Sequence, residues 1–379
     1  MVKLLDSTLR EGEQTAGVTF TVEQKVEIAR ALDAFGVEYI EAGHPAVSPD
    51  VLEGVRAVAR EGLHAEIVAH SRALRKDIDL VLQTDADWVG IFFSVADARL
   101  EEHFRKNEDE AVRLVQDCVS YAKAHGLKVR YTPEDTVRSR FETVVRVSRA
   151  AAEAGADRIS VADTTGYVDP FGMFDFVHRL RAAVPRTAAL GVHCHNDLGM
   201  AVANSLAAVR AGAEVVDVCV NGLGERAGIA PLAETAVALR LVQRAENAWR
   251  LDRLPGLSRL VEERAAVPLS PLAPIVGRNA FTHNAGLHVA AVLLNPAHYE
   301  SIPASLVGRE RRLVVDKMAG RPTVRHRLRG LGLAPTDEAC DAVLALVKAR
   351  DVNDADDAQL LALYAEAQGT PAMARTVAR

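Results

Sequence analysis

The stretch ALGVHCHND, residues 189–197, joins an apolar run to a pair of histidines. The apolar lead-in, Leu190–Val192, predicts a buried β-strand. Side chains two positions apart on a strand lie on one face, so His193 and His195 would point the same way at its C-terminal end. Two imidazoles with an acidic residue nearby are typical of a divalent-metal site that keeps open positions.

The acidic residue is found near the N-terminus, in the stretch DSTLREGEQ, residues 6–14, which follows a short apolar strand. Glu11 can supply a metal oxygen, and the planar guanidinium of Arg10 can grip a carboxylate or carbonyl group of a substrate. Asp6 lies on the strand itself and is expected to orient one of the histidines. The alternative, a surface salt-bridge cluster, is disfavoured because these residues directly follow an apolar strand.

Short apolar runs alternate with longer amphipathic stretches over the first two thirds of the chain. The predicted strands are Val2–Ser7, Tyr39–Ala42, Ala65–His70, Trp88–Phe93, Lys128–Tyr131, Arg158–Ala162, Leu190–His195 and Val215–Val220. The predicted helices are Val22–Phe35, Pro49–Glu61, Leu74–Gln83, Glu108–His125, Phe141–Ala154, Pro170–Ala183, Gly199–Ala211 and Pro231–Arg244. Strands that are each followed by a helix, in this number, predict a (β/α)8 TIM barrel.

The positions of the reactive side chains favour this barrel over a doubly wound open sheet. The G-x-G-x-x-G loop that usually follows the first strand of such a sheet is absent. Polar and charged residues follow the predicted strands: Arg10, Glu11, His70, Arg130, Glu134, Thr164, His193, His195 and Asn221. A barrel gathers its strand ends in one mouth, whereas an open sheet would spread them along a line. The expected fold class is therefore α/β, a TIM barrel followed by a mainly helical C-terminal region.

The pattern changes after about residue 250, where prolines cluster. We expect residues 1–250 to form the catalytic barrel, residues 251–320 a linker and small subdomain, and residues 321–379 a helical C-terminal subdomain. The linker contains the stretch FTHNAGLH, residues 281–288, which is polar and rich in small residues and histidine.

Composition limits the possible partners and the compartment. The 379 residues carry a net charge of −6, which argues against nucleic-acid binding. The four cysteines show no C-x-x-C spacing, which suits a reducing compartment better than a disulfide framework. The sequence opens directly on a strand and contains no long apolar run, so a cytoplasmic protein without a membrane partner is expected.

Three stretches together resemble one enzyme superfamily: DSTLREGEQ at residues 6–14, HCHND at residues 193–197 and NGLGERAG at residues 221–228. They are similar to the acyl-CoA-condensing TIM-barrel metalloenzymes, also termed the DRE-TIM metallolyases, whose barrel is pyruvate carboxyltransferase-like. This superfamily includes the 2-isopropylmalate, citramalate and homocitrate synthases and hydroxymethylglutaryl-CoA lyase. The resemblance extends from residue 2 to about residue 332 and is greatest to the homocitrate synthases.

The resemblance implies a role for each matching residue. Glu11, His193 and His195, with Asn221 as a further candidate, would bind one divalent cation, either Mg²⁺, Mn²⁺ or Zn²⁺. Arg10 would stabilise the alkoxide formed when acetyl-CoA attacks the keto carbon of 2-oxoglutarate. The carboxylates of the oxo acid would bind Arg130, Thr132 and Thr164, with His70 at the distal carboxylate. Glu134 and His288 would remove the methyl proton of acetyl-CoA.

The same resemblance implies a homodimer in which exchanged C-terminal segments bring His288 to the partner's active site. The family often has a tyrosine five residues after this histidine, where this chain has Leu293; Tyr299 is the nearest replacement. The implied pathway is lysine biosynthesis by the α-aminoadipate route, with synthesis of a nitrogenase cofactor as the alternative. Lysine would then be an inhibitor that competes for the 2-oxoglutarate pocket.

Three alternative functions remain open on the sequence. A 2-isopropylmalate or citramalate synthase without a regulatory domain would need an apolar pocket where His70 lies. A hydroxymethylglutaryl-CoA-type lyase usually has a cysteine in a loop that corresponds to residues 221–226, and this chain has none there. A catalytically silent sensor of a 2-oxo acid is disfavoured because all the expected reactive residues are present.

Overall fold

The computed structural model describes residues 1–369, which fall into two compact units. The first unit is Met1–Leu269, and the second begins at Ser270. The helix α9 (Leu254–Ala265), which lies within the expected linker, belongs to the first unit. The division into three parts at residues 250 and 320 stays a prediction.

The first unit contains a closed barrel in which parallel strands follow one another in chain order, and the last pairs with the first. The strands are β1 (Lys3–Asp6), β2 (Tyr39–Gly43), β3 (Glu66–Arg72), β4 (Trp88–Ser94), β5 (Lys128–Glu134), β6 (Arg158–Asp163), β7 (Ala189–Cys194) and β8 (Val215–Val218). The barrel is closed by the register that pairs Leu4 with Val216 and Asp6 with Val218. The predicted TIM barrel is confirmed.

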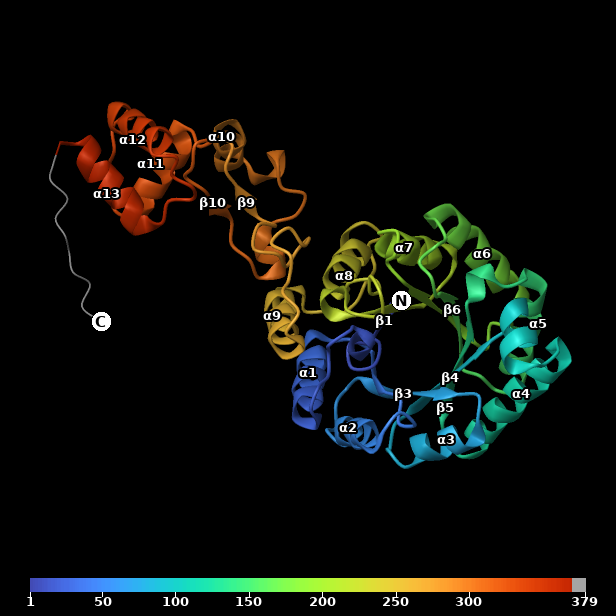
Figure 1. The fold of residues 1–379 in the computed structure, drawn as a ribbon. Helices are drawn as coiled ribbons and strands as arrows, with labels where there is room; N and C mark the ends of the chain where they lie inside the picture. Colours follow the sequence, from blue (N-terminus) through green and yellow to red (C-terminus); the bar gives the residue numbers. More distant parts are fainter. Residues whose placement is uncertain (370–379) are drawn as a thin grey trace. The chain divides into compact units, whose positions relative to one another are not determined.

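Helices surround the strands as an outer ring (Figure 1). They are α1 (Val22–Phe35), α2 (Pro49–Ala59), α3 (Arg75–Leu82), α4 (Glu108–Ala124), α5 (Phe141–Glu153), α6 (Pro170–Ala183), α7 (Ala201–Ala211) and α8 (Leu232–Leu241). The boundaries have local causes: Thr21 and Gln24 form a capping box at the start of α1, and Gly36, at φ 102°, ends it. The strands are fixed in place because these helices cover their outer face.

Aromatic and cationic side chains fill the N-terminal end of the barrel interior. The guanidinium carbon of Arg158 lies 4.0 Å from the ring centre of Tyr39 and 4.6 Å from that of Trp88. Leu5, Val68 and Val215 pack in the same cluster as these two rings, and all are buried. This end is therefore packed with side chains, and chemistry is left to the C-terminal end of the strands.

Short helical turns follow several strands at that C-terminal end. They are η1 (Gly12–Gln14), η2 (Arg99–Phe104), η3 (Thr136–Arg138) and η4 (Val220–Gly222), and η5 (Leu251–Arg253) precedes α9. The turn η2 is a π-helix, a form that is found frequently at functional sites. The sequence analysis predicts none of these turns, because each is too short for a periodic pattern.

The second unit has its own hydrophobic core. Its elements are β9 (Thr282–His283), α10 (Gly286–Leu294), η6 (Pro296–His298), η7 (Ala304–Val307), β10 (Arg312–Leu313), α11 (Arg321–Gly330), α12 (Asp337–Ala349) and α13 (Asp357–Ala367). Val324, Leu328, Val343 and Leu360 are fully buried in this core. The expected helical C-terminal region is confirmed over residues 321–367. Within residues 1–369, no helix combines the length and the apolar character needed to cross a bilayer.

Candidate active site

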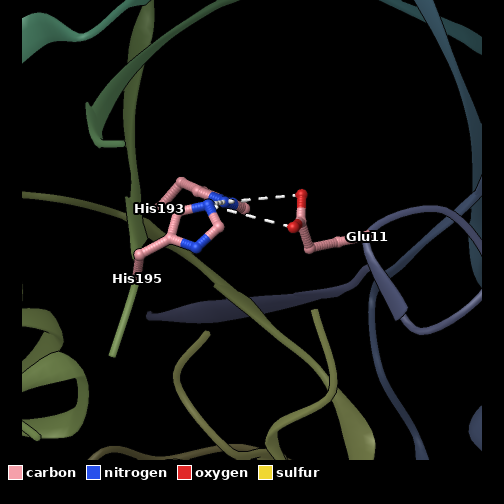
Figure 2. A group of neighbouring side chains, drawn as sticks. All are labelled: Glu11, His193 and His195. Atoms are coloured by element: carbon pink, nitrogen blue, oxygen red, sulfur yellow. Dashed lines mark hydrogen bonds and ion pairs between the residues drawn. The ribbon is translucent and has the colours of Figure 1, made fainter. Parts of the chain in front are cut away.

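Glu11, His193 and His195 form one buried cluster at the C-terminal ends of β1 and β7 (Figure 2). The two Nε2 atoms lie 3.4 Å apart. The Nε2 atoms of His193 and His195 lie 3.9 Å and 3.8 Å from the carboxylate oxygens of Glu11. The predicted sharing of one strand face by the two histidines explains why both rings reach the same carboxylate.

The 3.4 Å between the two Nε2 atoms fits two ligands of one divalent cation, and each Nε2 atom lies within 3.9 Å of a Glu11 oxygen. Two ligands about 2.1 Å from a cation lie about 3.0 Å apart when adjacent in an octahedron and about 3.4 Å apart in a tetrahedron. Nδ1 of His193 lies 3.2 Å from Oδ2 of Asp217, which fixes the ring and leaves Nε2 for the cation. Nδ1 of His195 is buried without a hydrogen-bond partner among the described residues.

The electrostatics keep Glu11 and His195 in the protonation states that a metal needs. Burial would raise the pKa of Glu11, but Arg10, His193 and His195 outweigh it and lower this pKa to about 2. Burial, with the neighbouring His193, lowers the pKa of His195 to about 4. At neutral pH, Glu11 is therefore a carboxylate and His195 a neutral imidazole, which are the forms that ligate a cation.

Glu41 on β2 organises the cationic side of the site. One of its oxygens accepts hydrogen bonds from Nε of Arg10 and Oγ of Ser7, both at 2.6 Å. Its other oxygen is paired with Nη2 of Arg130. Burial would raise the pKa of this carboxyl, but the two guanidinium groups hold it well below its usual range.

A cavity of about 410 Å³ brings most of the predicted residues together. Those that line it are Arg10, Glu11, His70, Arg130, Thr132, Glu134, Thr164, His193 and His195. Asp217, His44 and Phe92 also line it, and the sequence analysis assigned no role to them. The barrel mouth therefore gathers side chains from the ends of different strands, as the topology requires.

His70 lies between a carboxylate and an aromatic ring. Its Nδ1 lies 3.1 Å from Oε1 of Glu41, and its ring stacks on Phe92 with centres 4.6 Å apart. Burial and the nearby Arg10 lower the pKa of His70 to about 3. A carboxylate only accepts hydrogen bonds, so the neutral ring carries its hydrogen on Nδ1 and presents Nε2 as an acceptor.

Glu134 ends β5 at the rim of the cavity. Burial raises the pKa of this carboxyl, although Nη2 of Arg99, at 3.1 Å from Oε1, opposes the shift. Thr164 follows β6, and its hydroxyl accepts a hydrogen bond from the backbone N–H of Asp135 at 2.9 Å. Residues that follow β4 and β5 thus hold the Glu134 and Thr164 side chains in place.

Other predicted residues lie elsewhere. The side-chain oxygen of Asn221 accepts a hydrogen bond from the Ser258 hydroxyl at 2.5 Å, and its amide donates to the Ser258 carbonyl at 2.9 Å. Asn221 is thus bonded to α9, whereas the candidate metal group is Glu11, His193 and His195. His288 lies exposed on α10 of the second unit, with its ring 4.1 Å from that of Tyr299.

The expected role of Asp6 is wrong. Its Oδ1 accepts a hydrogen bond from the backbone N–H of Thr8 at 2.9 Å, and its Oδ2 has no partner among the described residues. Asp217 on β8 orients His193 instead. The sequence signal for Asp217 is weak, because it is one acidic residue inside a run of valines, Val215–Val218.

The fold and this cavity define a class, a TIM-barrel protein with a candidate divalent-metal centre. Residues 1–261 match the HMGL-like family, and residues 275–355 match the homocitrate synthase post-HMGL domain-like family. The chain is 50% identical to a homocitrate synthase of Pyrococcus horikoshii over 87% of its length and 90% of that protein. It is 44% identical to one of Saccharolobus solfataricus over 97% of its length and 80% of that protein.

Solved structures agree on the fold. The HMG-CoA lyase of Brucella melitensis superposes with a TM-score of 0.62 at 20% identity, covering 70% of this chain and 99% of that one. Hydroxymethylglutaryl-CoA lyase of Pseudomonas aeruginosa gives a TM-score of 0.63 at 20% identity, covering 71% and 94%. The chain belongs to the HMGL-like family and, within it, to the homocitrate synthases, which are acyltransferase enzymes.

Proposed function

We propose that the protein catalyses the metal-dependent Claisen condensation of acetyl-CoA with 2-oxoglutarate, which gives homocitrate and CoA. The observation that carries this proposal is the cavity in which a candidate metal cluster meets two arginines and a carboxyl with a raised pKa. The homocitrate synthases that the chain resembles at 44–51% identity support the choice of substrate.

Glu11, His193 and His195 would hold one divalent cation, either Mg²⁺, Mn²⁺ or Zn²⁺. When bound, the cation would supply Lewis-acid polarisation of the keto group and a template for the oxo acid. Because Glu11 and the two histidines would supply only three ligands, they would leave room for the keto oxygen and the C1 carboxylate of the substrate. The role of Asn221 as a further ligand stays a prediction, and the hydrogen bonds of its side chain to Ser258 argue against it.

Arg10 would stabilise the negative charge that develops on the keto oxygen. Its guanidinium is held by Glu41 through Nε and by Glu11 through Nη1, at 2.6 Å and 2.5 Å. Donors that are oriented before the reaction stabilise a transition state without the cost of reorganisation. This placement supports the role proposed for Arg10.

Removal of the methyl proton of acetyl-CoA would fall to Glu134 and His288. The resulting carbanion would attack the keto carbon to form a C–C bond, and the keto oxygen would become an alkoxide that takes up a proton to give the hydroxyl group. A carboxyl whose pKa is raised by burial, as that of Glu134 is, is a stronger base than an exposed one. Water then cleaves the thioester and releases CoA.

His288 would come from the partner subunit of a homodimer with exchanged C-terminal segments. Its exposure on α10 leaves the ring available to another molecule, and Tyr299 stacks against it. Tyr299 is the residue that we propose in place of the tyrosine absent at Leu293. This assignment makes the second unit part of each active site.

The substrate carboxylates would bind Arg130, Thr132 and Thr164, with His70 near the distal carboxylate. Two arginines in one cavity suit a dianionic oxo acid better than an apolar one. Competition by lysine for this pocket stays a prediction, which a lysine titration of the initial rate would test.

A CoA-release assay tests the proposed substrate. The metal is first removed with a chelator and then restored, and kcat/KM is compared for 2-oxoglutarate, 2-oxoisovalerate and pyruvate. We expect 2-oxoglutarate to give the highest value and activity to return only with the metal. A preference for 2-oxoisovalerate or pyruvate would replace the proposed function with a 2-isopropylmalate or citramalate synthase.

A further inference from the structure

Six side chains at the barrel mouth form a closed ring of polar contacts, in which every link except the 3.9 Å contact between Glu11 and His193 is a hydrogen bond or an ion pair. In order around the ring they are Arg10, Glu11, His193, Asp217, Arg130 and Glu41. Asp217 is the member that joins the metal side of the ring to Arg130. Its Oδ2 lies 3.2 Å from Nδ1 of His193 and 3.4 Å from Nη1 of Arg130.

The burial of Asp217 is energetically unfavourable, so packing alone does not explain this residue. It is 2% exposed, and its other oxygen, Oδ1, has no hydrogen-bond partner among the described residues. A buried carboxylate destabilises a fold unless it is fully paired, and valines flank this one in β8. An incompletely satisfied carboxylate at the middle of the barrel therefore points to a functional reason.

We propose that Asp217 is a positioning residue that couples the candidate cation site to the substrate arginine, an inference that rests on the proposed function. A carboxylate accepts hydrogen bonds, so Nδ1 of His193 carries the hydrogen and the Nε2 lone pair faces Glu11 and His195. The same oxygen restrains Arg130. One atom thus fixes the orientation of a metal ligand and of a substrate-binding guanidinium together.

The charges of the ring agree with this role. Three carboxylates, from Glu11, Glu41 and Asp217, face two guanidinium groups, from Arg10 and Arg130. The buried ring therefore attracts a cation before it accepts an anionic oxo acid. Replacing Asp217 by Asn removes one negative charge but keeps an oxygen acceptor, whereas Ala removes both.

The test is a calorimetric titration of the metal-free full-length protein with Mn²⁺. We expect Asp217→Asn to weaken binding about tenfold and Asp217→Ala up to about a hundredfold, because partners of metal ligands have effects of this size. At saturating Mn²⁺, the KM for 2-oxoglutarate should rise several-fold in Asp217→Asn, because the neutral amide holds the Arg130 guanidinium less strongly than the carboxylate does. Circular dichroism and thermal unfolding without metal show whether the variants fold.

Asp77→Asn is the matched control. Asp77 is also a buried aspartate shared by an arginine and a histidine: its Oδ2 lies 2.6 Å from Nε of Arg72 and 3.6 Å from Nε2 of His44. Neither partner belongs to the metal cluster. We expect the Mn²⁺ affinity of Asp77→Asn to stay within about twofold of the wild-type value.

Three results would overturn the proposal: a folded Asp217→Asn with wild-type Mn²⁺ affinity, an equal loss in Asp77→Asn, or an unchanged KM. If the Asp217 variants do not fold, nitrogen-15 NMR of histidine-labelled, metal-free wild-type protein decides. The proposal requires His193 to carry its hydrogen on Nδ1, and a hydrogen on Nε2 contradicts it. Failure of the wild-type protein itself to bind Mn²⁺ would instead refute the metal site of the proposed function.

Discussion

Glu41 accepts hydrogen bonds from side chains that follow β1 or lie on β3 and β5: Ser7, Arg10, His70 and Arg130. Its carboxylate therefore affects the charge balance or the hydrogen position of each of these side chains. For the two arginines it is the counter-ion, and for His70 it selects the ring nitrogen that carries the hydrogen. With its hydrogen on Nδ1 for Glu41, a neutral His70 has none on Nε2 to donate to the distal carboxylate of the oxo acid, which is the group it is expected to bind.

We expect the protein to take up a proton on His70 when 2-oxoglutarate binds. The Nε2 atom of neutral His70 cannot donate to a carboxylate, but the negative charge of that carboxylate would raise the pKa of His70 from about 3. Calorimetry of 2-oxoglutarate binding near pH 6, in two buffers of different ionisation enthalpy, should report uptake of up to about one proton per site. His70→Gln is the control and should show none.

An absence of proton uptake in the wild-type protein would mean that His70 stays neutral. The distal carboxylate would then be bound by Arg130, Thr132 and Thr164 alone. In that case His70→Gln should leave the KM for 2-oxoglutarate nearly unchanged.

Asp6 gives the stability a defined dependence on pH. Burial raises its pKa to about 7, from 3.8, so the folded protein holds a proton that the unfolded chain releases near pH 4. The folded state binds more protons in this range, and stability therefore falls as the pH rises from about 4 to about 7. Asp6→Asn removes this pH dependence. Between pH 4 and pH 7, the free energy of unfolding of the variant should therefore rise relative to that of the wild type by on the order of 2–4 kcal/mol.

Urea unfolding of both proteins at several pH values measures this difference. The amide of Asn keeps the acceptor for the Thr8 N–H, so the comparison isolates the charge. Parallel pH profiles would show that Asp6 is not protonated in the folded protein.

The strand-end residues of the site could be predicted from the sequence, whereas the buried carboxylates that hold them could not. Glu11 and His193 stand in local patterns that combine an apolar strand with polar residues at its end. Glu41 and Asp217 lie inside strands, and their roles depend on partners 29 to 89 positions away for Glu41 and 24 to 87 for Asp217. No local pattern encodes such contacts, because the closure of the barrel creates them.

At the scale of elements, the barrel follows from the alternation of apolar runs and amphipathic stretches. The bounds of α1 and α6 match their predictions. Thr21 caps the start of α1 in a capping box, and Asp169 caps α6, which begins with a proline. The strands β3 and β5 extend beyond their predicted ends, to Arg72 and Glu134, because pairing with neighbours continues there. Tertiary pairing therefore sets the strand ends that form the mouth.

The turn η4 and the helix α9 are joined by the side chain of Asn221, so its replacement should affect stability. Asn221 adopts a left-handed conformation, φ 57°, and makes two hydrogen bonds to Ser258. Asn221→Ala should cost about 1–3 kcal/mol, from the lost hydrogen bonds and the strained backbone. The Mn²⁺ affinity should not change, because the amide is already engaged.

Urea unfolding and Mn²⁺ calorimetry of the same preparation separate the two effects. Asn221→Gly is the control that relieves the backbone strain while still removing the hydrogen bonds, so it should fall between the wild type and Asn221→Ala. A loss of Mn²⁺ affinity at unchanged stability would restore Asn221 to the list of metal ligands.

At the scale of the whole molecule, the residues of the proposed reaction are divided between two units. Arg10, Glu11 and Glu134 belong to the first unit, and His288 belongs to the second. Each unit has its own cluster of buried apolar side chains. Under the proposed function, the second unit would supply a residue of the reaction.

A mixture of two inactive variants tests whether His288 acts on the partner's barrel. Arg10→Ala inactivates the first unit and His288→Ala the second. If sites are shared between subunits, a mixed dimer has one site with both substitutions and one with neither, so co-expression should restore about a quarter of the wild-type activity. Co-expression of Arg10→Ala with His193→Ala is the control and should restore none, because every site then contains a damaged barrel. If each chain used its own His288, the first pair would also stay inactive.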